Sequence, residues 1–70
     1  MQDLHRMVDI AENKSKKNPK LRKGDILFNL VDQEYGHITS KLRNTEYDPS
    51  RNNLRIPKFL GKMKQELKKH

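Results

Sequence analysis

Three histidines are the first candidates for chemistry in this chain, because imidazole binds metal ions and transfers protons near neutral pH. They stand at His5, His37 and His70, in three different parts of the 70-residue chain. None has a carboxylate at the spacing that would complete a metal-ligand set. His37, beside a predicted helix start, is typical of a surface or capping residue. The histidines therefore predict no metal site and no cofactor.

Acidic residues are the second candidates, because two carboxyl groups in a pocket can act as acid and base. Glu34, Glu46 and Asp48 could approach one another only through the folding of a loop. Capping or ion pairing is the simpler interpretation of each. The three glycines stand too far apart to form the loop that cradles a nucleotide phosphate. We expect a protein that is not an enzyme.

Basic residues are the most prominent feature, with 16 lysines and arginines against 9 acidic residues and a formal net charge of +7. Such clusters attract phosphate backbones or acidic protein surfaces. Lysine is a hydrated point charge and outnumbers arginine, which favours contact that does not depend on base sequence. The alternative is that these basic residues only form a solvated surface and bind no partner. The candidate nucleic-acid-binding residues are Lys14, Lys16, Lys17, Lys20, Arg22 and Lys23, with Lys41, Arg43 and Arg51 extending the same surface.

The aromatic residues could stack on unpaired bases if they were exposed between basic residues. Phe28 and Phe59 lie on apolar stripes, which predicts core positions. Tyr47 is the better candidate, since it lies in a polar segment between Arg43 and Arg51. Anchoring its own loop to the core is the simpler role for this side chain.

Helical periodicity predicts the elements that must position these residues. An apolar stripe marks a helix from about 2 to 15, and Asn18 and Pro19 end it, since proline disfavours helical geometry in the residue before it. Residues 13–20 are predicted to be a basic linker. The stripe is also a typical set of helix-in-groove anchors for a protein partner. Its residues are Leu4, Met7, Val8 and Ala11.

The central segment repeats apolar residues at three- and four-residue steps from about 25 to 44. Asp25 is a candidate cap or first-turn acid at its start. Gly36 interrupts the pattern, which predicts a bend or two helices, about 25–35 and 37–44. Two such helices also suggest a DNA-reading helix-turn-helix, although Asp32 stands where that motif needs a small residue. The side chains offered to a groove would be Thr39, Ser40, Lys41 and Arg43.

The last third of the chain is predicted to be a loop followed by a helix. The loop covers residues 44–53 and includes one helical turn capped by Asp48 and begun by Pro49. Pro57 is suited to the first turn of the final helix, and the lysines of that helix are expected on its solvated face. Phe59 sits beside the apolar stripe. The stripe itself is Ile56, Leu60, Met63 and Leu67.

These elements predict an all-α fold, a small bundle of three to four short helices with a basic linker after the first helix. Residues 1–20 are expected to form the amphipathic helix and linker, and residues 21–70 a compact helical domain. The lack of cysteine excludes disulfides and fits a reducing compartment. No apolar run approaches the roughly twenty residues that span a bilayer, and no signal-peptide stretch opens the chain. We therefore expect a cytoplasmic protein without membrane contact.

Three short segments read Arg22-Lys-Gly-Asp-Ile-Leu-Phe-Asn-Leu, Leu42-Arg-Asn-Thr-Glu-Tyr-Asp-Pro and Leu54-Arg-Ile-Pro-Lys-Phe-Leu. Together they resemble a pattern in small uncharacterised bacterial and phage-type proteins, in which a Phe-Asn helix, a Thr-x-x-Asp-Pro loop and an Arg-x-Pro-x-Phe helix follow one another. The resemblance covers about residues 22–61 and implies no known activity. The chain departs from it at residues 50–53, where aromatic and acidic residues are expected.

The resemblance implies a structural role for several polar residues. Asn29, Thr45, Asp48 and Arg55 are expected to tie the loop to two helices, with Asp48 paired to Arg55. The function expected from the residues is a small basic, non-enzymatic binding protein that contacts nucleic acid through phosphate-directed lysine and arginine. The alternative is a protein-interaction module, such as a phage-type regulator or inhibitor, that binds an acidic protein.

Overall fold

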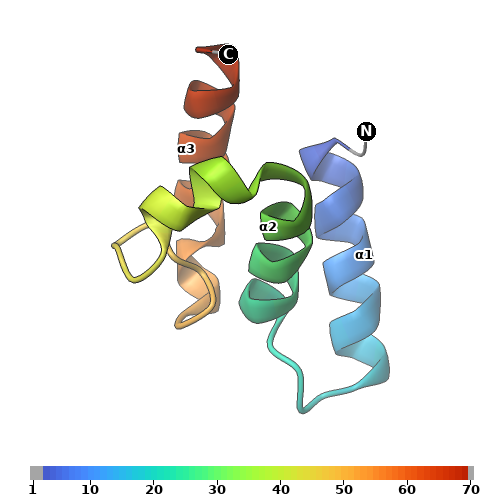
Figure 1. Cartoon of the computed structure of the whole chain (residues 1–70). Helices are drawn as coiled ribbons and strands as arrows, with labels where there is room; N and C mark the ends of the chain where they lie inside the picture. The colour runs from blue at the N-terminus through green and yellow to red at the C-terminus, as the bar shows by residue number, and fades with distance from the viewer. Residues whose placement is uncertain (1–2, 70) are drawn as a thin grey trace.

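The structure, a computed structural model, describes residues 3–69 and is all-α in that range. Helix α1 (Leu4–Lys17) is followed by α2 (Lys23–Leu42), a short 3-10 helix η1 (Asn53–Arg55) and α3 (Ile56–Lys68). Helix α1 and the first part of α2 lie side by side and antiparallel, and α3 lies on the other side of α2 (Figure 1). The all-α prediction is confirmed.

Helix α1 begins and ends at recognisable polar residues. The Asp3 side chain accepts a hydrogen bond from the Arg6 backbone N–H at 2.8 Å, which caps the first turn. At the other end, Asn18 adopts an extended backbone before Pro19. The helix runs to Lys17, so the predicted linker is wrong for residues 13–17. Lysine is a good helix former, and only the Asn-Pro pair stops the helix.

Helix α2 confirms the predicted bend. Tyr35 has φ −130° and ψ 44°, a non-helical conformation inside an otherwise continuous helix, directly before Gly36. The helix starts two residues earlier than expected, so Asp25 lies in its first turn as an acid and Arg22 occupies the cap position. The bend turns the second part of α2 toward α3 (Figure 1).

Helix α3 follows η1 without an interruption, and Pro57 lies in its first turn as predicted. Its buried residues are Ile56, Phe59 and Met63, whereas Leu60 and Leu67 are only partly buried. The centre of the apolar face is therefore Phe59 and not Leu60, because the Phe28 ring packs there at a centroid distance of 5.7 Å.

One hydrophobic core joins all three helices. Leu4, Met7 and Ala11 of α1 are buried in it, and Val8 packs against it half-buried. Three of the four residues predicted as anchors for a protein partner are therefore covered in this structure, because the apolar face of α1 packs against its own chain. The remaining buried apolar residues are Leu27, Phe28, Val31, Ile38, Leu42, Ile56, Phe59 and Met63.

Within residues 3–69, no helix combines the length and the apolar composition that a bilayer crossing requires.

Candidate nucleic-acid interface

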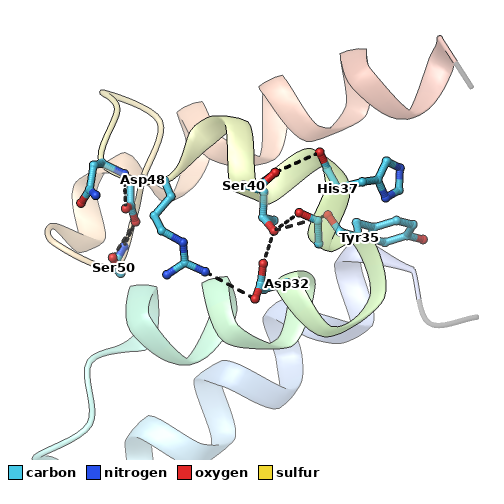
Figure 2. A network of polar contacts seen from close by, with 10 residues as sticks. Asp32, Tyr35, His37, Ser40, Asp48 and Ser50 are labelled. Carbon is cyan, nitrogen blue, oxygen red and sulfur yellow. Dashed lines mark hydrogen bonds and ion pairs between the residues drawn. The ribbon is translucent and has the colours of Figure 1, made fainter.

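The loop between α2 and η1, residues 43–52, is held in shape by one buried carboxylate. Asp48 is 1% exposed. It accepts hydrogen bonds from the Asn44 N–H at 2.8 Å, the Ser50 N–H at 2.9 Å and the Ser50 hydroxyl at 2.6 Å. Figure 2 shows Asp48 and Ser50 facing each other in this arrangement. Asn44 adopts a positive φ of 64°, a conformation that asparagine tolerates better than most residues.

The pKa of Asp48 lies below the ordinary value for aspartate. Burial is the largest single influence and would raise the pKa, but the hydrogen bonds from Asn44 and Ser50 favour the charged form and outweigh it. The positive charge of Arg43 acts in the same direction. Hydrogen bonds from three donors to a charged carboxylate are strong, and they stabilise the conformation of the loop.

The predicted pairing of Asp48 with Arg55 is wrong. Arg55 reaches the same loop but donates to the Thr45 carbonyl oxygen at 3.3 Å, while Asp48 uses donors of the loop itself. Asn29 is exposed and takes no part in these contacts. The network therefore does tie the loop to the start of α3, with different partners from those expected.

The loop also docks on the start of α2. A side-chain oxygen of Asn53 accepts the Gly24 N–H at 2.8 Å, and Arg22 donates to the Arg51 carbonyl oxygen at 3.3 Å. A Cβ atom at Gly24 would lie 2.0 Å from the Pro49 carbonyl oxygen, so only glycine allows this approach. The residues where the chain departs from the resembled pattern thus make contacts of their own, with Asn53 satisfying a free N–H at the helix start.

These contacts bring arginines together that are far apart in sequence. Arg22 and Arg51 meet through the hydrogen bond above, and Arg51 also donates to the Asn44 side-chain oxygen at 3.0 Å. Lysines of the last turn of α1 and of the α1–α2 loop adjoin Arg22 along the chain. We call this set the basic end. It consists of Lys14, Lys16, Lys17, Lys20, Arg22 and Arg51, all of them exposed and without an ion pair to any acid among residues 3–69.

Three other predicted phosphate contacts lie in different surroundings. Lys23 approaches Glu12 at 4.0 Å, which offsets its charge. Arg43 pairs with Asp32 at 3.4 Å and lies over the Phe28 ring at 5.0 Å, so its guanidinium serves the fold. Lys41 is exposed in the last turn of α2, after the bend, and does not belong to the basic end.

Polar contacts at the bend of α2 involve one of the side chains that the helix-turn-helix hypothesis offers to a DNA groove. The Thr39 hydroxyl donates to Asp32 and lies 3.3 Å from the Gly36 carbonyl oxygen, and Thr39 is fully buried. The Ser40 hydroxyl donates to the His37 carbonyl oxygen at 3.3 Å. A buried Thr39 cannot reach a base, so the groove-reading interpretation is wrong for this residue.

Two of the four lysines of α3, and Lys69 directly after it, lie near carboxylates. Lys58 bonds Glu46 at 3.1 Å, and Lys62 and Lys69 both approach Glu66. The hydrogen bond and charge of Lys58 hold the pKa of Glu46 below its ordinary value. These pairs join exposed or partly exposed groups and contribute little to stability, and they leave Lys64 and Lys68 without an ion pair among residues 3–69.

No group of three or more His, Asp or Glu side chains within residues 3–69 is placed to hold a metal ion. His5 and His37 are exposed, and His70 lies outside the described residues.

Comparison with protein-family models, with curated proteins and with solved structures found no match to this chain. The resemblance to small bacterial and phage-type proteins thus stays a prediction, and the class that the fold defines is a small all-α protein with one basic end.

Proposed function

We propose that this chain is a non-enzymatic nucleic-acid-binding protein whose basic end contacts phosphates. The observation that carries the proposal is that Arg51 is hydrogen-bonded to Arg22, which follows four exposed lysines in the chain, and that none of these six cations has an ion pair to an acid among residues 3–69. Unpaired cations keep their full attraction for a polyanion, whereas ion-paired ones have to be released first. Lys23 and Arg43 are left out because each faces a carboxylate.

The mode of contact proposed is independent of base sequence. Four of the six residues are lysines on a helix end and a loop, and the two arginines already donate to backbone or amide oxygens. Part of this charge also stabilises α1 itself, because lysines in the last turn offset the negative end of the helix dipole. The lysines still attract phosphate while they have this local role.

The test is a titration of labelled random-sequence duplex and single strand at about 50 and 200 mM salt. Six phosphate contacts predict a loss of roughly 10³-fold in affinity between the two salt concentrations. The variant Lys17→Gln/Lys20→Gln should lower the slope of log K against log salt by about 1.8 for duplex.

The matched control is Arg6→Gln/Lys68→Gln, which removes the same net charge from the opposite end of the molecule. The start of α1 and the end of α3 lie there, away from the α1–α2 loop (Figure 1). Equal slopes for the two variants would show that net charge and not the basic end drives binding. Absence of binding at the lower salt would end the proposal.

A protein-interaction module for an acidic partner, such as a phage-type regulator or inhibitor, is the second candidate. A specific observation favours it: Leu54 is 85% exposed and Leu21 44% exposed, and the two segments that carry them are joined by the Arg22–Arg51 and Gly24–Asn53 hydrogen bonds. Such an apolar and basic surface suits an acidic protein face. Stoichiometric capture of one acidic protein, lost in Leu54→Ser but kept in Arg6→Gln/Lys68→Gln, would favour this candidate.

A further inference from the structure

A hollow of about 300 Å³ lies on the outer face of α3, against the loop of residues 43–52. Its volume is at the lower end of the range for small-molecule sites. The side chains around it are an aromatic ring, two cations, an amide and a proline. They belong to Tyr47, Pro57, Lys58, Lys62 and Gln65, and Gly61 completes the lining.

Gly61 contributes no side chain to the lining of the hollow. It lies in the interior of α3, where glycine is unfavourable for a helix relative to alanine. Nothing in the chain requires it, because a Cβ atom placed there would have no neighbour within 4 Å. Its missing side chain instead leaves free space in the hollow that Tyr47 also lines. A ligand in that space is a physical reason for glycine at this position.

The ring of Tyr47 is the surface on which a ligand would lie. The Lys62 and Lys58 ammonium groups stand 5.5 and 5.9 Å from its centroid. Cation–π contacts at exposed sites are weak, so a flat group can replace them over the ring and leave the ammonium groups to their carboxylate partners, Glu46 and Glu66. An acidic chain would therefore gain little here, because the lysines are already paired, while a planar base can use the tyrosine ring.

We propose that this hollow binds one unpaired nucleobase of a single-stranded nucleic acid, with the base stacked on Tyr47 and the phosphates of the strand left to the basic end. The Gln65 amide can donate to and accept from the edge of the base. The inference rests on the function proposed above and adds to it the form of nucleic acid. The loop that carries Arg51 to the basic end also carries Tyr47 to the hollow, so one strand can contact both.

The experiment uses the full chain with Tyr35→Phe, which leaves Tyr47 as the only tyrosine. Its fluorescence is followed during titration with a single strand, with duplex and with poly-glutamate at about 50 mM salt. Quenching by the single strand alone is the expected result, because a stacked base quenches tyrosine. In the same background, Gly61→Leu fills the hollow. It should weaken single-strand binding about 5- to 100-fold and leave duplex binding unchanged, since stacking of one base is lost.

Folding of the Gly61→Leu variant is checked by its Tm, which should equal or exceed that of the parent because leucine favours a helix. Gly61→Ala serves as a milder second variant. Single-strand binding without quenching and without an effect of Gly61→Leu would contradict base binding in the hollow. It would not contradict the phosphate contacts of the basic end. Equal quenching by poly-glutamate would overturn it as well. No binding of any nucleic acid would remove both proposals together.

Discussion

Asp48 shows how one buried charge can organise a loop. Three donors of the loop surround its carboxylate, and no buried side-chain nitrogen or oxygen within residues 3–69 is left without a hydrogen-bond partner. Hydrogen bonds to a charged group contribute about 1.5–3 kcal/mol each in favourable cases. The loop that carries Tyr47 and Arg51 therefore depends on the ionised form of Asp48.

Acid should weaken the fold through this residue. The pKa of Asp48 is lower in the folded chain than in the unfolded chain, where it is about 3.9. Its stabilisation is thus fully present above the unfolded pKa and is lost as the pH falls through the folded pKa. Asp48→Asn should lower the free energy of unfolding by about 2 kcal/mol at pH 7 and show a smaller loss of stability on acidification than the parent.

Urea unfolding at pH 7, 5 and 3 measures both effects. Asp9→Asn, which changes an exposed carboxylate on α1, is the control and should stay within about 0.5 kcal/mol of the parent. Parallel pH profiles for Asp48→Asn and the parent would contradict the role given to this carboxylate.

At the scale of elements, the contact between the loop and the start of α2 sets the position of both. Because Gly24 has no side chain, the Pro49 carbonyl group can approach it closely. The Asn53 side chain then accepts a hydrogen bond from the Gly24 N–H. The same contact places Arg51 beside Arg22. The basic end is therefore built by packing between two segments that are 29 residues apart.

A pair of glycine substitutions tests this contact. Gly24→Ala should destabilise the fold by roughly 1–3 kcal/mol, because its Cβ would overlap the Pro49 carbonyl and force the loop to move. Gly61→Ala has open space and should stabilise α3 by about 1 kcal/mol. Thermal and urea unfolding of the two variants measure the difference. A neutral Gly24→Ala would mean that the loop does not dock on α2.

At the scale of the whole molecule, one core of three helices fixes the basic end in space. Helix α1 supplies Leu4, Met7 and Ala11 to this core and carries three lysines of the basic end in its last turn. The chain has a Cα radius of gyration of 11.2 Å and extents of 35 × 25 × 17 Å, so it is small and its core is shallow. The loss of one helix leaves little core behind.

The fragment of residues 21–70 should therefore fail to unfold cooperatively. Removal of α1 uncovers the face of α2 that α1 packs against, and each buried leucine or methionine lost costs about 2–5 kcal/mol. Circular dichroism during thermal unfolding measures the effect, with Met7→Ala in the full chain as an intermediate case. A sharp transition in the fragment at the Tm of the full chain would establish that residues 21–70 fold on their own.

The sequence by itself determined the helices, the bend beside Gly36, the core positions of Phe28 and Phe59 and the turn at Pro49, because each depends on local periodicity or on the backbone preference of one residue. It missed the partners of Asp48 and left open whether the α1 stripe packs against its own chain. These depend on which segments meet in space, and several side chains were chemically able to make the same bonds. Only the tertiary structure decided that Arg51 meets Arg22 and that Arg43 turns to Asp32, because packing around Gly24 and the bend of α2 sets those distances.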